Sequence, residues 1–402
     1  MSRDEDCDRW IKETMTNVIE TLGVNKDDAH YELATSTDIY SSTMHYVTVK
    51  FKSKTSSENE EYALILKRPM QIEIIRELFR VDFQFHNEIL FYQTYARPGD
   101  NFPRCFYTAE RPPTDSVLAL ENVTKSGYHA YPQGYNAPLE YTLAAMREIG
   151  RFHGKGYVMK KLQREEFFGI VERIQEGRYD LKMSDNYLRP FFNCMAPRAV
   201  EYLRRQGYDP VFCDKTETLL SDAFDRIMLK TVQPQEPLST LCHGDFTLNN
   251  MLFKAEGDGQ YRAMLIDFAL IIHATPVVDL STYLCLSCSN EIRKEKFPEI
   301  MRAYHDALKE YLQDAGIWDA KKYSYDAIVE NYVKGSLFGF VIASFYLVIL
   351  MGRCTVGPEQ LVHIDTTEFA MMCKEAGGDE MSKILADMLL ELKDLGCLKH
   401  LL

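Results

Sequence analysis

HGDFTLNN, residues His243–Asn250, places an aspartate, Asp245, five positions before an asparagine, Asn250, in a chain of 402 residues. Two interpretations are open here: a polar turn at the surface, or a loop that carries chemistry. In phosphoryl transfer, one short loop supplies a carboxylate that receives the proton of the attacking hydroxyl and an amide oxygen that binds magnesium. The rest of the chain has to distinguish between the two.

A third polar residue follows this loop. YRAMLIDF, residues 261–268, is an apolar run that predicts a short strand, and Asp267 comes directly after its AMLI part. The segments on either side have the helical period, as in EYTLAAMREIGRFHG, residues 140–154. We therefore expect a mainly helical region that carries a short hairpin, with Asp245 and Asn250 on one loop.

The N-terminal part predicts a small antiparallel sheet. HYVTVKF, residues 45–51, alternates, with Val47, Val49 and Phe51 on one face. A polar connection, KSKTSSENEE, separates it from a second apolar run, YALILK, which ends at Lys67. Two such runs around a polar connection are typical of a hairpin. Farther along, SVLALENV, residues 116–123, predicts another strand, which ends in Glu121 and Asn122.

A helix is predicted between these strands. In FQFHNEILFYQTY, residues 83–95, Phe85, Ile89 and Tyr92 recur at helical spacing, and Glu88 belongs to the same packed face. A carboxylate on a buried face needs a partner. A lone lysine at a strand end is usually solvated, but Lys67 is a candidate partner because Glu88 follows at a suitable interval.

Five residues now stand in an order that phosphoryl transfer from ATP requires. A lysine holds the nucleotide phosphates and a glutamate holds the lysine, while oxygen ligands fix magnesium and an aspartate receives the acceptor's proton. The set is Lys67, Glu88, Asp245, Asn250 and Asp267. No single pair is specific, but the ordered set favours chemistry over a surface turn.

Composition narrows the possible functions. The net charge of −13 argues against nucleic-acid binding, because contacts to phosphates need clustered Lys and Arg. The ten cysteines are scattered, and the one tight pair, Cys285 and Cys288, is interpreted as buried free thiols, with zinc binding as a minor alternative. The first residues lack the apolar segment of a signal peptide, so we expect a reduced, cytoplasmic protein.

One apolar stretch, residues 335–351, has no charge over 17 residues, which is the short limit for a membrane span. We interpret it as a buried core helix of a large lobe. The sequence therefore predicts no membrane anchor.

The chain resembles the kinase-like superfamily of small-molecule phosphotransferases, which includes aminoglycoside phosphotransferases and choline kinases. Within that superfamily it is most similar to the ecdysteroid-kinase-like (CHK kinase-like) family. The resemblance covers about residues 30–350 and rests on five motifs: CHGDFTLNNMLF, LIDFALIIHATPVVDL, FHNEILFY, FPRCFYTAE with LALENV, and REIGRFHG.

The resemblance implies a two-lobed, protein-kinase-like α+β fold. A small antiparallel-sheet N-lobe would occupy residues 1–123, and a larger, mainly helical C-lobe would occupy residues 124–402. It also implies roles for the residues: Asp245 as catalytic base, Asn250 and Asp267 as magnesium ligands, Lys67 on the ATP phosphates with Glu88 as its partner, Leu120, Glu121 and Asn122 at the hinge that meets adenine, and Asp279 as a brace of the catalytic loop.

The sequence departs from the family pattern in the N-lobe. The family's glycine-bearing turn should lie within ATSTDIYSSTMHY, residues 34–46, yet no glycine occurs between Gly23 and Gly99. Glycine lets backbone amides approach phosphates at positive φ. Either hydroxyls of Ser36, Thr37, Ser41 and Ser42 donate instead, or the loop folds differently, and we include Ser41 and Ser42 among the nucleotide-binding residues. Two further departures are Thr247, where the family usually has tryptophan, and Ala269, where it often has glutamine.

The function expected from these observations is ATP- and magnesium-dependent phosphorylation of a hydroxyl on a small, apolar acceptor. The resemblance implies an ecdysteroid, a related sterol or a xenobiotic. Two alternatives stay open: a catalytically inactive kinase-like protein that binds a hydrophobic ligand, motivated by the missing glycines, and a choline- or aminoglycoside-type phosphotransferase. Among the histidines, we expect His243 to brace its loop through backbone hydrogen bonds and His153 to be a satisfied core residue.

Overall fold

The computed structural model describes residues 3–24, 26–38, 41–52, 59–179, 188–257, 259–355 and 365–401. The chain divides into two compact units, Met1–His129 and Ala130–Leu402. The division comes six residues after the expected end of the N-lobe at Val123. Most of the polar connection expected between the two hairpin strands, residues 53–58, lies outside the described residues.

The N-terminal unit contains a five-stranded antiparallel sheet with the strand order β1-β2-β3-β5-β4. The strands β2 and β3 form the predicted hairpin, in which Val49 lies opposite Tyr62 and Met44 lies opposite Lys67. The strand predicted at residues 116–123 is β5, which pairs with β3. The bounds are β1 Ala29–Asp38, β2 Ser42–Lys52, β3 Asn59–Pro69, β4 Cys105–Ala109 and β5 Val117–Glu121.

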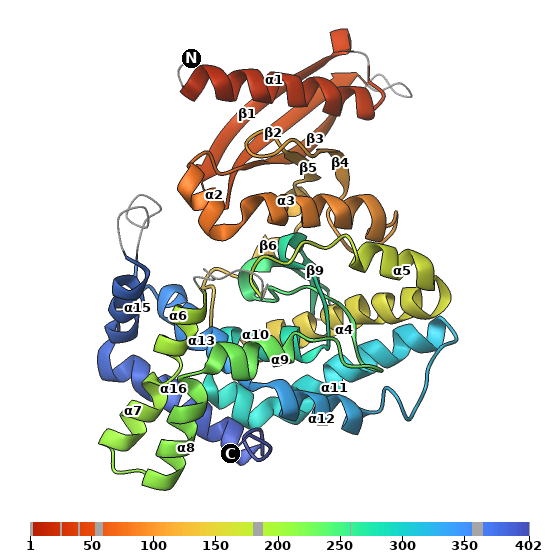
Figure 1. Ribbon diagram of the computed structural model, residues 1–402. Coiled ribbons are helices and arrows are strands. Elements are labelled where there is room, and N and C mark those ends of the chain that lie inside the picture. Colours follow the sequence, from red (N-terminus) through yellow and green to blue (C-terminus); the bar gives the residue numbers. More distant parts are fainter. Residues whose placement is uncertain are drawn as a thin grey trace. The chain divides into compact units, whose positions relative to one another are not determined.

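One face of this sheet is covered by α1, Arg3–Thr21 (Figure 1). Val47, Val49 and Phe51 point to this buried face, as their alternation predicted. They pack with Trp10 and Met15 of the helix in one apolar cluster. Burial of alternate residues on one face is what fixes the register of the hairpin.

Whereas α1 was not predicted, the helix predicted between the strands is present. It consists of α3, Val81–Leu90, followed by one π-helical turn, η2, Phe91–Tyr95, and it is preceded by the short α2, Glu73–Phe79. Phe85, Ile89 and Tyr92 are all buried, so the predicted packed face is correct. Glu88 is buried with them.

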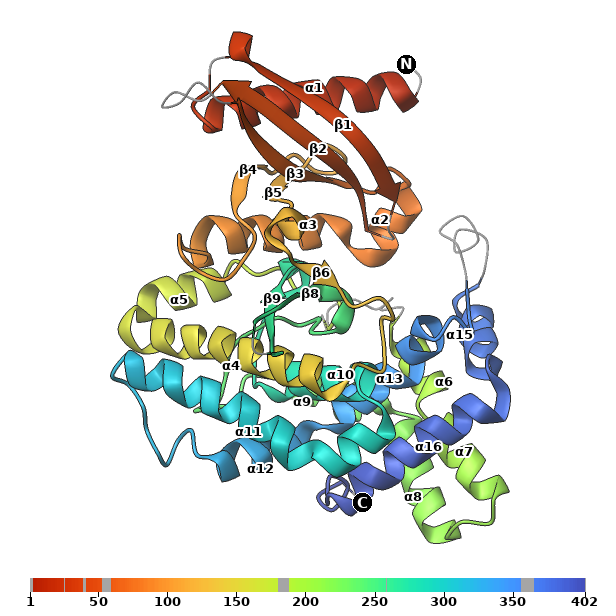
Figure 2. The same ribbon diagram turned by 180° about the vertical axis from the view of Figure 1, so that it is seen from behind.

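The C-terminal unit is mainly helical, and its long helices α4 and α11 lie side by side (Figure 2). Its strands are short: β7, Thr240–Cys242, pairs with β10, Ile272–Ala274, and β8, Met251–Ala255, forms a hairpin with β9, Tyr261–Leu265. The helices are α4 Leu139–Leu162, α5 Arg164–Val171, α6 Leu188–Met195, α7 Arg198–Arg205, α8 Pro210–Leu220, α9 Leu229–Thr231, α10 Val277–Ser287, α11 Asn290–Asp314, α12 Tyr325–Gly335, α13 Leu337–Leu350, α15 Thr366–Glu375 and α16 Gly378–Asp394. A sheet-bearing N-terminal unit and a mainly helical C-terminal unit confirm the predicted fold class.

Most of the apolar stretch at residues 335–351 forms α13, and a bend of 53° separates this helix from α12, to which Gly335 belongs. Phe340, Val341 and Val348 are fully buried in the core of the C-terminal unit, as expected of a core helix. Among the described residues, no single helix has the length and apolar character to cross a membrane, and only the bent pair α12–α13 meets those criteria together.

Candidate active site

The loop after β7 brings Asp245 and Asn250 into direct contact. Nδ2 of Asn250 donates to the backbone oxygen of Asp245 at 3.0 Å and to its carboxylate Oδ2 at 2.7 Å. Both acceptors are oxygens, so the amide nitrogen must face Asp245. The oxygen Oδ1 of Asn250 then points away from these bonds and can bind a metal ion or a donor group. The 3-10 turn η5, Leu248–Asn250, sets the spacing between the two side chains.

His243 ties this loop to the segment before Asp267. Its Nδ1 accepts a hydrogen bond from the backbone N–H of Asp245 at 3.3 Å, and its Nε2 donates to the backbone oxygen of Ile266 at 3.0 Å. One ring nitrogen accepts and the other donates, so the ring links the two segments. His243 therefore braces the loop through backbone hydrogen bonds, as the sequence analysis expected.

Asp267 follows β9 in a left-handed backbone conformation, with φ 65°. A non-glycine residue in this region is unusual and persists only where its surroundings hold it. The preceding Ile266 donates its N–H to the backbone oxygen of Asn250 at 3.1 Å, which fixes the two segments side by side.

The electrostatics of Asp245 reflect this proximity. Burial raises the pKa of its carboxyl, and the negative charge of Asp267 raises it further. His243, Arg178 and the hydrogen bond from Asn250 act in the opposite direction, but the net shift is upward. The carboxylates of Asp245 and Asp267 and the amide oxygen of Asn250 are ligand types that suit Mg²⁺.

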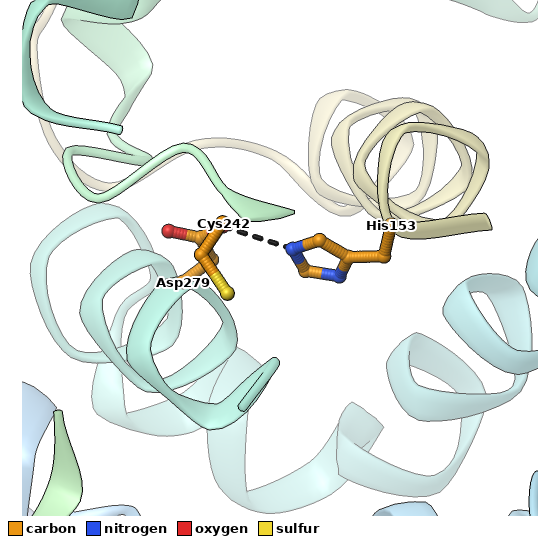
Figure 3. Close-up of side chains that lie close together, drawn as sticks. All are labelled: His153, Cys242 and Asp279. Carbon is orange, nitrogen blue, oxygen red and sulfur yellow. Dashed lines mark hydrogen bonds and ion pairs between the residues drawn. The ribbon is translucent and has the colours of Figure 1, made fainter. Parts of the chain in front are cut away.

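Asp279, in the first turn of α10, binds the backbone of the loop that carries Asp245. It is fully buried, and its two carboxylate oxygens accept the backbone N–H groups of His243 at 2.7 Å and Gly244 at 2.8 Å. His153 of α4 contacts the same carboxylate through Nε2 at 2.9 Å (Figure 3) and reaches Tyr304 through Nδ1, also at 2.9 Å. Although burial opposes ionisation, the hydrogen bond from His153 and the neighbouring donors hold the pKa of Asp279 below its ordinary value. The expected satisfied core histidine is thus a partner of Asp279.

Cys242 completes a buried trio with His153 and Asp279, whose potential ligand atoms lie within 4.8 Å of one another (Figure 3). Burial raises the pKa of the Cys242 thiol well above its ordinary value, and its Sγ donates to the backbone oxygens of Ala274 and Thr275 at 3.4 Å. A protonated thiol is a poor metal ligand. Hydrogen bonding therefore accounts for this trio better than a metal does.

Arg178 is a residue of this site that the sequence analysis missed. Its Nη1 donates to the backbone oxygen of Gly244 at 2.8 Å, and its Nη2 donates to the backbone oxygen of Leu270 at 3.0 Å. Glu176 forms an ion pair with the guanidinium at 3.1 Å. No sequence motif marks this residue, because its two acceptors are backbone carbonyls, which every residue has.

In the N-terminal unit, Lys67 of β3 and Glu88 of α3 form an ion pair of 2.7 Å. Their side chains are only 8% and 2% exposed, and the Lys67 ammonium also lies 5.9 Å from the centre of the Phe85 ring. The buried carboxylate predicted on the packed face of the helix thus has the lysine as its partner. Buried charges of this kind are stable only as pairs.

The expected hinge segment ends β5. Leu120 and Glu121 are partly buried in the sheet, and the N–H groups of Glu121 and Asn122 donate to the backbone oxygens of Arg104 at 2.8 Å and Ala63 at 2.9 Å. The Asn122 side chain caps the turn η3, Val123–Ser126, by accepting from the Thr124 N–H. An adenine at this segment would therefore use backbone groups other than these two amides.

The turn between β1 and β2 comprises residues 39–41, and residues 39 and 40 lie outside the described residues. Ser41 accepts the N–H of Met70 at its backbone oxygen. The hydroxyl of Ser42 is buried with no hydrogen-bond partner in the described part of the chain. Ser36 contacts Nδ1 of His45 at 2.7 Å, so its hydroxyl already has a partner.

Solved structures that resemble this chain are kinase-like phosphotransferases. One comes from Ralstonia eutropha JMP134 and was assigned to the aminoglycoside phosphotransferases: TM-score 0.38, 11% identity, covering 91% of this chain and 93% of that one. An aminoglycoside phosphotransferase of type 2″, solved with GDP and kanamycin, has a TM-score of 0.37 and 12% identity over 90% of this chain and 98% of its own. Another aminoglycoside phosphotransferase, of type 4, was solved with ADP and hygromycin B. It has a TM-score of 0.29 and 12% identity over 84% of this chain and 98% of its own. Similarity this low supports no statement about the activity of this chain.

No protein with a curated description matches the chain in sequence. The model of the ecdysteroid kinase-like family, however, matches residues 36–317, which is more than two thirds of the chain and includes Lys67, Glu88, Asp245, Asn250, Asp267 and Asp279. The chain therefore belongs to the ecdysteroid kinase-like family.

Proposed function

We propose that this protein is an ATP- and magnesium-dependent kinase that phosphorylates a hydroxyl of a small, apolar acceptor, such as an ecdysteroid, a related sterol or a xenobiotic. The observation that carries the proposal is the direct contact between Asp245 and Asn250, with Asp267 close enough to raise the pKa of Asp245. Membership of the ecdysteroid kinase-like family supports the same reaction class.

Asp245 would receive the proton of the acceptor hydroxyl. A general base is most effective when its pKa approaches the working pH, and the upward shift at Asp245 moves the carboxyl in that direction. The amide of Asn250 holds this carboxylate by one oxygen, Oδ2. The base is thus oriented without being neutralised by a full positive charge.

Asn250 and Asp267 fit a magnesium ion. The nitrogen of the Asn250 amide is committed to Asp245, which leaves its oxygen as a ligand, and Asp267 supplies a carboxylate. When bound, the ion would neutralise the charge of the nucleotide phosphates. Carboxylate and amide oxygens favour hard cations such as Mg²⁺ over soft metals.

Lys67 would contact the nucleotide phosphates, with Glu88 holding its ammonium in position. Leu120, Glu121 and Asn122 are the proposed adenine-contacting segment, and Ser41 and Ser42 the proposed replacement for a glycine turn. Among the described residues, the hydroxyl of Ser42 has no hydrogen-bond partner, and it is fully buried.

The acceptor proposal is supported by exposed apolar side chains on the C-terminal unit. Tyr346 of α13 is 37% exposed, and Met371 and Met372 of α15 are 45% and 39% exposed. Partial burial and the negative charge of Asp245 raise the pKa of Tyr346 to about 12, so this ring lies near the proposed base. Phe191, Phe192 and Phe340 are buried in the core and would not contact an acceptor.

Calorimetric titration of ATP into the purified protein tests the proposal. Binding should require magnesium, disappear with a chelator, and be strongly weakened by Asp267→Asn. Asp245→Asn should keep nucleotide binding while turnover falls by roughly 10²–10⁴-fold, as expected when a general base is lost.

The absence of binding to a folded wild-type protein would instead favour the non-catalytic alternative, which the missing glycines motivate. A panel of sterol and cationic amine acceptors separates the proposed substrate class from a choline- or aminoglycoside-type activity. Phosphorylation of the amines alone would replace the apolar acceptor in the proposal.

A further inference from the structure

We propose that Arg178 is a positioning residue that sets the spacing between the loop of Asp245 and the segment that follows Asp267. This inference rests on the proposed function, because it assigns Arg178 a role in aligning the base with the magnesium ligands. Arg178 would touch neither substrate nor nucleotide, and would act only through the backbone.

The two hydrogen bonds of the guanidinium end on residues directly beside the site. Gly244 precedes Asp245, and Leu270 closes the 3-10 turn η6, Phe268–Leu270, that begins at Asp267. Both acceptors are carbonyl oxygens that point toward one cation. Without that cation the two negative ends would face each other, and the two segments would move apart.

The guanidinium is itself held in place. Glu176 accepts from its Nε at 3.3 Å and from Nη2 at 3.1 Å, and also accepts the Arg178 backbone N–H at 2.7 Å. The guanidinium carbon lies 5.0 Å from the centre of the Tyr179 ring. That ring is buried near Phe224 and Phe338, with ring-centre distances of 6.3 and 6.1 Å, so the guanidinium packs against a residue of the core.

The geometry is specific to arginine. A planar guanidinium donates in several fixed directions at once, and here it serves two carbonyls and a carboxylate with one charge. A lysine ammonium is a single point donor on a flexible chain. Arg178→Lys should therefore keep the charge and lose the spacing.

Steady-state kinetics on Arg178→Ala, with and without added guanidinium ion, test the inference. We expect kcat to fall by roughly 10–10²-fold, the effect of a misplacement of about 1 Å, while magnesium-dependent ATP binding changes little. Millimolar guanidinium chloride should restore part of kcat, and sodium chloride at the same concentration should not. Arg204→Ala removes an exposed arginine that pairs with Asp214 and Glu217, and serves as a matched control with wild-type kcat.

Wild-type kcat in Arg178→Ala, or a loss that guanidinium does not restore in a folded variant, would overturn the role of Arg178. If Arg178→Ala does not fold, Arg178→Lys replaces it: a lower kcat at unchanged ATP affinity supports the inference, and an unchanged kcat refutes it. Failure of the wild type to bind magnesium-ATP would refute the proposed function itself, which keeps the two failures distinct.

Discussion

Gly244 is the position where a single added carbon should disturb the site most. Its φ is +79°, which glycine adopts far more easily than other residues, and a Cβ atom there would lie 1.8 Å from the backbone oxygen of Leu270. Gly244→Ala therefore forces apart the two segments that carry Asp245 and Asp267. The change adds no charge and removes no hydrogen-bonding group.

Two contributions to the effect can be separated. The positive φ alone should destabilise an alanine by roughly 1–2 kcal/mol. The steric contribution is larger, because Cβ atoms essentially never approach such an oxygen closer than 3.0 Å, so the gap must widen by at least 1.2 Å. A displacement of about 1 Å between reacting groups lowers kcat by roughly 10²-fold.

Gly207→Ala provides the matched control. Gly207 has a similar φ of +75°, but a Cβ there would meet nothing within 4 Å, so the substitution introduces backbone strain without a clash. Urea unfolding should show a loss of stability in both variants, and kcat should fall only in Gly244→Ala. Wild-type kcat in a folded Gly244→Ala variant would show that the spacing of these segments does not govern turnover.

Substitutions of four charged residues test these contacts further. Glu88→Leu leaves the Lys67 ammonium buried without its carboxylate and should lower the free energy of unfolding, measured in urea, by about 3–5 kcal/mol. The double variant Lys67→Met with Glu88→Leu should have a stability close to that of the wild type but should not bind nucleotide. Asp245→Asn should raise the melting temperature at pH 7: the folded-state pKa of Asp245 lies above 3.8, so its ionised form destabilises the fold at high pH, and the advantage of asparagine should shrink as the pH falls toward 3.8. Asp279→Asn should lower the free energy of unfolding by about 1–3 kcal/mol, because the NH₂ group of the new amide would face a backbone N–H. An unchanged melting curve would contradict the bracing role of Asp279.

The Lys67–Glu88 pair of the N-terminal unit could be predicted because its signals are local. Alternation in β2 specifies which face is buried, and the helical period places Glu88 on the packed side of α3. A buried carboxylate requires a cation, and Lys67 is close in sequence and on the adjoining strand. The strand β1 gives no comparable signal, because it is an edge strand with mostly exposed residues, such as Leu33.

The residues that hold the loop of Asp245 in the C-terminal unit are harder to predict. Arg178 bonds carbonyls 66 and 92 positions away, and His153 meets Asp279 at a separation of 126 residues. Helical spacing places His153 on a buried face but cannot name its partner. A backbone acceptor has no residue type, so a contact such as Arg178 to Gly244 leaves no trace in composition or periodicity.

The loops around Asp245 combine features that are individually unfavourable: a carboxyl whose pKa is raised by burial and by Asp267, and an aspartate at φ 65°. Each would be relieved by an ordinary substitution, such as Asp245→Asn or a glycine at position 267. They are held in place by contacts from His243 and Arg178 that do not themselves require a strained loop. Strain maintained by a dedicated set of braces is typical of sites whose geometry serves a reaction. In a protein that only bound a hydrophobic ligand, removal of this strain would raise stability at no cost to function. The arrangement therefore favours the catalytic proposal.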